Sequence, residues 1–222
     1  MKVTLIGHTH PSNLDMNTPQ DLVAYCARVS NPSNQMNKET SEKLLNYLIK
    51  HKHWSPFEMV NVCLEIETTR DIARQILRHR SFSFQEFSQR YADPTKDLDF
   101  VLRDARLQDE KNRQNSVELD MKNDDHRRLA YQWKQQQRRV IDAAKEAYSW
   151  AVDHGIAKEQ ARAVLPEGNI LSRMYVNGTL RSWIHYIELR SANGTQKEHI
   201  DIALQCAEII STIFPMVKID KS

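Results

Sequence analysis

The clearest pattern of hydrophobic and polar positions lies between residues 59 and 67. Four apolar residues alternate there with four polar ones, namely Val60, Val62, Leu64 and Ile66 with Asn61, Cys63, Glu65 and Glu67. Successive side chains of a β-strand point to opposite faces, so this alternation predicts a strand with one buried and one polar face. Segments rich in apolar residues at 3–6 and 171–176 predict two further strands.

Apolar residues that recur every three or four positions predict helices along most of the remaining chain. The predicted ranges are 19–29, 41–51, 70–77, 125–154, 158–164, 179–189 and 196–213. Thr40 or Ser41 and the pair Thr68-Thr69 are suitable N-caps, and Gly155 is a suitable stop for the long helix. That helix is expected to turn these residues inward: Leu129, Trp133, Val140, Ile141, Ala144, Tyr148 and Val152. Trp150 is likewise interpreted as a core residue.

Between residues 103 and 128 the chain is dense in charge and has no hydrophobic period. Seven basic and seven acidic residues occur there with few large apolar side chains. With its flanking residues, the segment 93–128 is interpreted as a solvated insertion or lid. No internal repeat, proline-rich linker or low-complexity tract divides the chain. The sequence therefore predicts one α+β domain over residues 1–222, in which a small sheet packs with several helices, one of them long.

Charge and composition narrow the possible functions. Thirty-one basic and 29 acidic residues give a net charge of +2, which argues against a generic nucleic-acid coat or a polybasic membrane binder. The mean hydropathy of −0.65 is low for a globular domain. It indicates either that much of the helix surface faces solvent or that the subunits of an oligomer complete one another's cores. No apolar run approaches a membrane span, and no signal segment is evident, so a soluble cytoplasmic protein is expected.

The cysteines, histidines and glycines exclude several kinds of site. Cys26, Cys63 and Cys206 form no CxxC pair and are odd in number, which argues against a disulfide framework or a thiolate zinc site. The pairs His8/His10 and His51/His53 lack a third ligand at a recognised spacing, so no metal site is predicted. Only five glycines are present, without GxGxxG or a P-loop, so any phosphate must be bound by side chains.

The densest candidate chemistry lies at residues 70–90. Five arginines stand there against Asp71 and Glu86, and serines alternate with Phe82, Phe84 and Phe87. Guanidinium groups and hydroxyls are good donors to phosphate oxygens, and the aromatic rings offer stacking surface, which suits a nucleotide or a flavin. For a generic arginine-rich stretch, the alternative is a cationic helix end followed by an amphipathic strand.

The spacing RHRxxSxxxxSxR resembles the signature of flavin-dependent thymidylate synthases. Its fixed positions are filled by Arg78, His79, Arg80, Ser83, Ser88 and Arg90. Supporting segments at 27–30, 53–58, 162–166 and 180–190 resemble the family and occur in the family's order. The resemblance covers residues 24–92 and 157–200 well and the charged middle hardly at all.

The resemblance implies reductive methylation of dUMP to dTMP. NADPH reduces FAD, methylenetetrahydrofolate donates one carbon, and the flavin supplies the hydride. No protein nucleophile attacks the uracil in this scheme, so Ser88 is interpreted as a ligand, and no neighbouring acid/base pair is evident to activate it. The family also implies a homotetramer with active sites shared between chains. From the balanced charge, neither nucleic acid nor a membrane is expected as a partner.

The resemblance also assigns roles to individual residues. Contacts with dUMP are expected from Gln75, Arg78, Glu86, Phe87, Ser88, Gln89, Arg90, Arg162 and Arg190. Contacts with FAD are expected from Ser55, Arg78, His79, Arg80, Glu86, Arg181 and His185, and from Ser30, His53 and Thr179. Arg190 is the expected catalytic residue, because its counterpart favours the ionised pyrimidine at N3. Without the resemblance, Arg190 would be interpreted as a helix C-terminal cation.

Two other functions remain open at the level of sequence. The Arg/Phe-rich segment 74–90 could serve a single-stranded nucleic-acid binder, whose affinity would fall steeply with salt. A degenerate family member would bind nucleotide without turnover.

Overall fold

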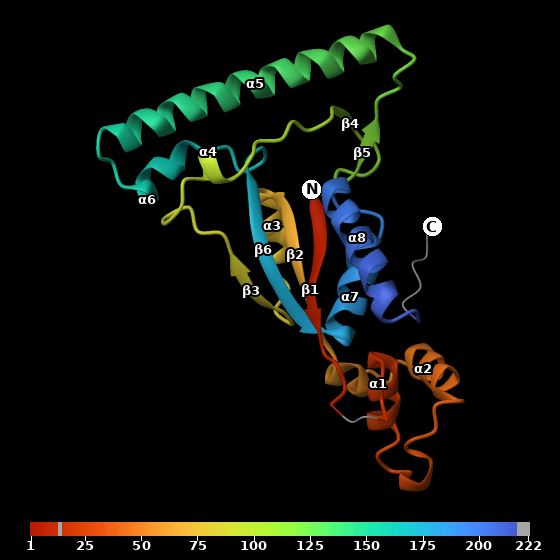
Figure 1. Ribbon diagram of the computed structural model, residues 1–222. Coiled ribbons are helices and arrows are strands. Elements are labelled where there is room, and N and C mark those ends of the chain that lie inside the picture. Colours follow the sequence, from red (N-terminus) through yellow and green to blue (C-terminus); the bar gives the residue numbers. More distant parts are fainter. Residues whose placement is uncertain (13–14, 217–222) are drawn as a thin grey trace.

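A computed structural model describes residues 1–12 and 15–216. Its centre is a four-stranded antiparallel sheet with the order β1-β2-β6-β3, formed by Lys2–His8, Asn61–Thr69, Leu171–Thr179 and Ser83–Glu86 (Figure 1). β2 and β6 pair along their whole length, from Asn61 with Thr179 to Thr69 with Leu171. A separate hairpin consists of β4, Arg106–Gln108, and β5, Ser116–Glu118.

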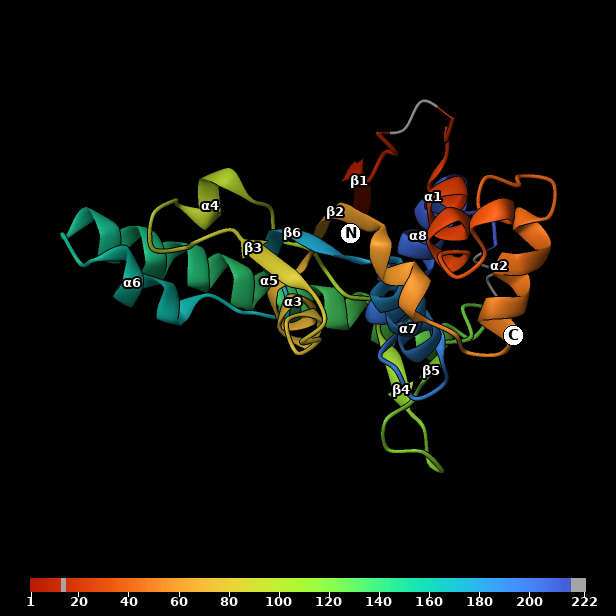
Figure 2. The ribbon, with the colours of Figure 1, turned by 90° about the horizontal axis from the view of Figure 1, so that it is seen from below.

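Eight α-helices and three 3-10 turns are present in the described part of the chain. The α-helices are α1 (Pro19–Ala27), α2 (Ser41–Lys50), α3 (Arg70–Ile76), α4 (Pro94–Asp97), α5 (Asp124–Asp153), α6 (Lys158–Ala161), α7 (Leu180–Ser191) and α8 (Lys197–Ile213). The 3-10 turns are η1 (Pro32–Asn34), η2 (Ser55–Met59) and η3 (Arg162–Val164). α5 lies at one end of the molecule and α1 and α2 at the other (Figures 1 and 2). The predicted α+β fold with one long helix is confirmed.

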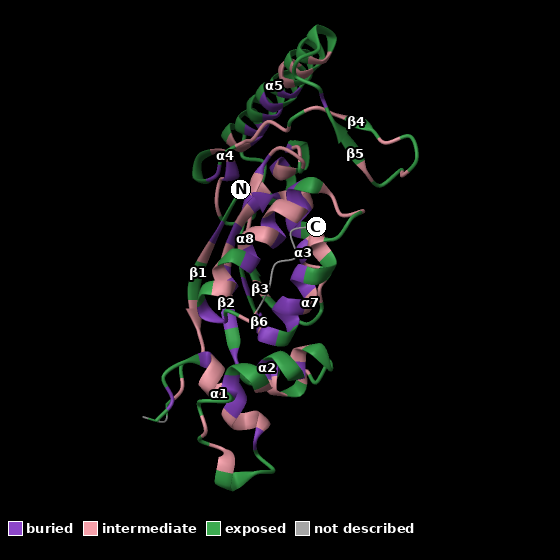
Figure 3. Ribbon diagram, turned by 90° about the vertical axis from the view of Figure 1, so that its right-hand side faces the viewer, coloured by how far each residue is buried: buried purple, intermediate pink, exposed green. Residues whose placement is uncertain are grey.

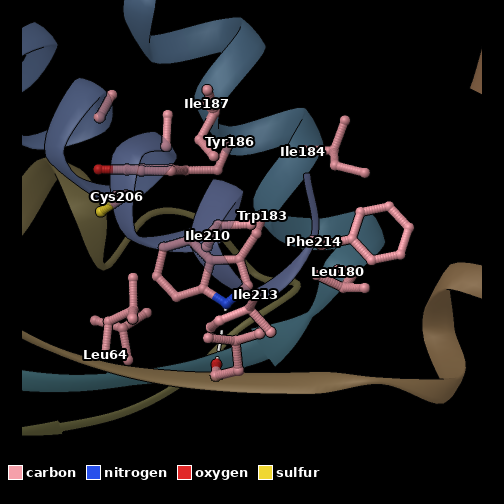
Figure 4. Packing of buried hydrophobic residues seen from close by; sticks show 14 of the residues in the cluster. Leu64, Leu180, Trp183, Ile184, Tyr186, Ile187, Cys206, Ile210, Ile213 and Phe214 are labelled. Atoms are coloured by element: carbon pink, nitrogen blue, oxygen red, sulfur yellow. Dashed lines mark hydrogen bonds between the residues drawn. The ribbon is translucent and has the colours of Figure 1, made fainter. Parts of the chain in front are cut away.

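The core forms between the sheet and the helices α7 and α8. The apolar face predicted for β2 is confirmed, because Val62, Leu64 and Ile66 are completely buried. Trp183 of α7 packs over this face and donates its indole N–H to the carbonyl oxygen of Val62 at 3.0 Å (Figure 4). Phe214, at the end of α8, is completely buried in the same cluster. Figure 3 shows the buried residues concentrated where α3, α7 and α8 lie along the sheet.

The prediction for the inward face of α5 is only partly right. Ile141, Ala144 and Tyr148 are buried as expected. The expectation is wrong for four other residues, with exposed fractions of 41% for Leu129, 44% for Trp133, 54% for Val140 and 57% for Trp150. The reason is that α5 crosses one end of the molecule and extends beyond the sheet, so the sheet and its helices do not cover its whole length (Figure 1). Leu129 and Trp133 lie beside the insertion, where they line a cavity with Arg103, Arg106 and Ser116, and they remain partly open to solvent.

The segment 93–128 contains α4 and the β4–β5 hairpin, and ion pairs attach it to the core. Arg103 bonds to Thr69 at 2.6 Å and also pairs with Asp71. Arg106 of β4 pairs with Glu198 of α8 at 2.7 Å. No helix in the described ranges is long and apolar enough to cross a membrane. In the same ranges, no three His, Cys, Asp or Glu residues gather to hold a metal ion.

Candidate functional site

The RHR segment begins where α3 ends and leads into β3. Phe82 fixes its path, because the ring packs against Trp183 with 4.6 Å between centroids. The ring also lies over Gly178 of β6, where a Cβ atom would come within 2.3 Å of Phe82 Cδ1. Only glycine leaves room there for this approach. The strand β6 and the helix α7 together position the segment that carries Arg78, His79 and Arg80.

The first group of predicted residues joins the end of α3 to the end of α7. Arg190 Nε donates a hydrogen bond to His79 Nε2 at 2.9 Å. Burial, together with the charges of Arg190 and Arg78, lowers the pKa of His79 to about 4. The imidazole is therefore neutral near pH 7 and accepts from the guanidinium. This bond orients Arg190 and leaves its other N–H groups available to a ligand.

Gln75 lies close to this pair and is held by residues that sequence reasoning missed. Its Nε2 donates to Gln196 at 2.9 Å, and its Oε1 lies 3.2 Å from His199 Nδ1. His199 is completely buried. A polar residue on the apolar face of a helix is the only sequence signal that could have singled it out.

The second group lines a cavity of about 310 Å³ between α3 and the α6–β6 segment. The predicted residues Gln89 and Arg162 line it together with Arg70 and Arg74, which sequence reasoning did not assign. Gln89 is 3% exposed, and its Nε2 has no hydrogen-bond partner among the described residues. Glu159 and Glu167 line the cavity as well, and Glu167 pairs with Arg74 at 2.7 Å and with Arg70 at 3.5 Å. Arg162, which has no carboxylate partner among the described residues, and the unpaired buried donor of Gln89 are suited to an anionic ligand.

Several predicted dUMP ligands lie along the chain beside this cavity. Glu86, at the end of β3, accepts a hydrogen bond from Ser172 at 2.7 Å and lies 3.7 Å from Arg70. The next residue, Phe87, donates its backbone N–H to the carbonyl of Arg173. The carbonyl of Ser88 closes a turn by accepting from Tyr91 and Ala92. This turn buries Gln89 and exposes Arg90.

The third group gathers where η2 meets the start of α7. The His185 ring contacts Trp54 edge-on at 4.7 Å, next to Ser55, and Arg181 pairs with Glu58. Thr179 is the N-cap of α7, with its hydroxyl accepting from Ser182 N–H at 3.2 Å. The other two predicted FAD ligands, His53 and Ser30, are exposed, and Ser30 follows α1.

Unpaired positive charge surrounds these groups. Within the described residues, the guanidinium groups of Arg78, Arg80, Arg90 and Arg162 form no ion pair with a carboxylate, and the first three are exposed. FAD carries a diphosphate and a planar ring system, and dUMP carries a phosphate. Free guanidinium groups fit the phosphates. The exposed ring of His53 and the half-buried ring of Trp54 offer surface to the ring system, so the residues present fit both molecules.

The three groups remain separate within one chain. In the described residues, no hydrogen bond, ion pair or ring contact joins a predicted residue of one group to a predicted residue of another. The three groups are thus built by different sets of elements within the chain.

Comparisons with known proteins identify the family of the chain. Residues 12–216 match the Thy1 family, described as thymidylate synthase complementing protein. The chain is 48% identical over 217 residues to a probable flavin-dependent thymidylate synthase of Paramecium bursaria Chlorella virus 1, covering 98% of this chain and 97% of that protein. It is 49% identical over 201 residues to the flavin-dependent thymidylate synthase of Synechocystis, covering 90% and 88%.

A solved structure shares the fold. It is the UMP/dUMP methylase PolB of Streptomyces cacaoi, crystallised with 5-Br dUMP, with a TM-score of 0.78 and 26% identity over 97% of this chain and 92% of that one. The RHRxxSxxxxSxR spacing, the matched family and relatives of nearly full length lead to one conclusion. The chain belongs to the Thy1 family of flavin-dependent thymidylate synthases, which convert dUMP to dTMP.

Proposed function

We propose that this chain binds dUMP and FAD side by side on its arginine-rich face and that Arg190 activates the pyrimidine. The observation that carries the proposal is the 2.9 Å bond from Arg190 to the neutral His79, in the middle of the RHR signature. FAD, when bound and reduced by NADPH, supplies the hydride, and methylenetetrahydrofolate supplies the carbon.

The role of Arg190 follows from the chemistry of its side chain. A guanidinium stays protonated at any pH at which the protein is folded, and it stabilises negative charge that develops in a dry site. Placed at N3 of the uracil, Arg190 would favour the ionised ring and raise the electron density at the carbon that accepts the methylene. His79 holds the guanidinium in place without competing for negative charge, because a neutral imidazole accepts through a lone pair.

The remaining residues bind and orient the two anions. We assign the dUMP phosphate to the cavity lined by Gln89 and Arg162, together with Arg90 and the turn at Ser88. We assign the rest of the nucleotide to Gln75, Glu86 and Phe87. For FAD we assign Arg78, Arg80 and Arg181 to the diphosphate. The other FAD contacts are assigned to Ser30, His53, Ser55, His79, Glu86, Thr179 and His185. These assignments are supported by the guanidinium groups of Arg78, Arg80, Arg90 and Arg162, which have no carboxylate partner among the described residues, and by the unpartnered Gln89 Nε2.

We further propose a homotetramer whose subunits share active sites. It is supported by the separation of the three groups within one chain and by the exposed stripe of α5 with Trp133, Val140 and Trp150. A cytoplasmic location is supported by three free cysteines.

A flavin absorbance spectrum before and after addition of dUMP tests the proposal. We expect the purified protein to bind FAD, the flavin bands to shift with dUMP, and tritium to be released from dUMP labelled at uracil C5 when methylenetetrahydrofolate and NADPH are added. Flavin binding without tritium release would indicate a member that does not turn over. Salt-sensitive binding of single-stranded nucleic acid, with no response to FAD, would favour the alternative function.

A further inference from the structure

Beneath Gln75 lies a buried pair of titratable side chains to which the proposed chemistry gives no role. Tyr186 of α7 is 2% exposed and His199 of α8 is completely buried. The Tyr186 hydroxyl lies 3.1 Å from His199 Nε2, and His199 Nδ1 lies 3.2 Å from Gln75 Oε1. Burial, followed by the charges of Arg190 and His79, lowers the pKa of His199 to about 3. The imidazole is therefore neutral, with one ring nitrogen donating and the other accepting.

The same hydrogen bonds continue from Gln75 in the opposite direction to the charged insertion. Gln75 Nε2 donates to Gln196 Oε1 at 2.9 Å, and Gln196 Nε2 donates to Glu198 Oε2 at 3.0 Å. Glu198 is 5% exposed, and its other oxygen pairs with Arg106 at 2.7 Å. Side chains from α7, α8, α3 and β4 thus form one continuous chain of hydrogen bonds.

The carboxylate at one end determines the direction of every bond in this chain. An ionised Glu198 only accepts, so Gln196 must turn its N–H group toward it. The Oε1 of Gln196 then faces Gln75 and requires the N–H group of Gln75. The Oε1 of Gln75 in turn requires an N–H at His199 Nδ1, which leaves Nε2 to accept the proton of the Tyr186 hydroxyl.

We propose that this one-way chain locks the side-chain amide of Gln75 in a single orientation, which makes His199 a positioning residue for dUMP. The inference rests on the proposed function, because it takes Gln75 as a contact of the nucleotide. A glutamine amide without such partners can rotate by a half-turn and exchange its donor for its acceptor. His199 and Glu198 prevent this exchange from opposite sides, and Arg106 extends the support into the insertion.

Two amide substitutions at residue 199 form a matched pair that tests the inference. In His199→Asn the amide N–H takes the place of Nδ1–H and can still donate to Gln75. In His199→Gln the amide takes the place of Nε2 and reaches Tyr186 instead. Both variants bury one amide at the same position. We expect H199N to keep the wild-type KM for dUMP and H199Q to raise the KM about tenfold. A tenfold change corresponds to the net contribution of about one hydrogen bond.

The readout must separate positioning from damage to the fold. We expect H199Q to change the KM for dUMP more than kcat and to leave the Kd for FAD unchanged. The conservative core variant Ile210→Val, on the same helix, controls for perturbation of α8. Equal KM values in H199N and H199Q, or a parallel loss of FAD affinity in H199Q alone, would overturn the inference.

Two further variants keep the test decisive. In Glu198→Gln the new amide can donate an N–H group to Gln196, so the direction of the hydrogen bonds is no longer fixed. This variant should therefore also raise the KM for dUMP. It provides a test even if H199Q does not fold. Gln75→Leu tests the proposed function itself. If Q75L leaves the KM for dUMP unchanged, Gln75 is not a nucleotide contact. If Q75L raises it while H199Q and E198Q do not, only the positioning role is wrong.

Discussion

Arg190 is the residue on which the proposed chemistry depends most directly. Arg190→Ala should lower kcat at least 100-fold, the usual effect of removing a group that stabilises charge in a transition state. The Kd for FAD should change less than threefold, because the assigned diphosphate ligands are Arg78, Arg80 and Arg181. Steady-state tritium release and flavin titration measure the two quantities. Near-full turnover of R190A would contradict the assignment.

The two neutral histidines make the stability of the chain depend on pH. His79 has a pKa of about 4 and His199 of about 3 in the folded state, below the ordinary value of 6.5. The unfolded chain therefore takes up more protons as the pH falls below about 6.5, and the free energy of unfolding decreases. Each histidine contributes up to about 1.4 kcal/mol per pH unit.

Urea unfolding of the apoprotein between pH 7 and pH 5 measures this dependence. We expect H199N to show a shallower decrease than the wild type, because the asparagine has no proton to take up. A decrease of equal slope in both proteins would show that His199 does not carry the effect.

At the level of single residues, the sequence singles out candidates where a motif fixes the spacing, and it misses residues whose partners come from distant elements. Arg78, His79 and Arg190 were assigned, and the structure brings His79 and Arg190 into contact across 111 positions. His199 and Arg70 were missed, because their partners Gln75 and Glu86 are known only once the fold is known. The position of His199 on the apolar face of a helix marks it as unusual, but the sequence does not show which distant residue is its partner.

At the scale of elements, the contact of β6 with the RHR segment leaves no space for a side chain at residue 178. The Cβ of Gly178→Ala would overlap the ring of Phe82, which is held by Trp183. Overpacking of this kind costs about 1–3 kcal/mol. We expect G178A to lose stability and to bind FAD more weakly, because a displaced Phe82 moves the residues on either side of it.

Gly168→Ala is the matched control for this prediction. A Cβ there meets no atom within 4 Å. Urea unfolding and flavin titration should leave G168A close to the wild type. Equal stability of G178A and G168A would show that Phe82 can yield without cost.

Arg103 is the principal attachment of the insertion to the core. Its guanidinium, with a side chain 18% exposed, bonds to Asp71, Thr69 and the carbonyl of Gly168. Removing these charge-assisted bonds should cost about 2–3 kcal/mol. Arg103→Ala should lower the urea midpoint accordingly. In contrast, Arg128→Ala removes only an exposed pair with Asp125 and should change the stability by less than about 0.5 kcal/mol.

The type and position of the main elements followed from the sequence, but their pairing did not. The alternation in β2 and the helical periods of α2, α7 and α8 are local properties, because buried faces impose a fixed spacing. The edge strand β3 has only four residues, and its pairing with β6 joins positions about 90 residues apart. The hairpin β4–β5 has strands of three residues, too short to show a period.

On the scale of the whole molecule, the error in the prediction for α5 is itself informative. Periodicity identified apolar residues correctly, but a single chain does not bury all of them. Ile141 and Tyr148 pack inside the fold, whereas Trp133, Val140 and Trp150 form a flanking stripe on the surface. Exposed stripes of this kind mark interaction sites. The low mean hydropathy of the chain and the separation of the three groups of site residues are consistent with an oligomer whose subunits share the site.

If this stripe forms the subunit interface, its middle must remain apolar. Val140→Glu places a charge at the centre of the apolar stripe and should dissociate the oligomer, since an unpaired charge is costly to bury in an interface. Gln135→Glu adds the same charge on another face of α5 and is the matched control. Analytical ultracentrifugation should find smaller species for V140E but not for Q135E, and FAD binding should weaken only in V140E. If V140E stays assembled, this stripe is not the interface; if it dissociates with its FAD affinity intact, the flavin site is complete within one chain.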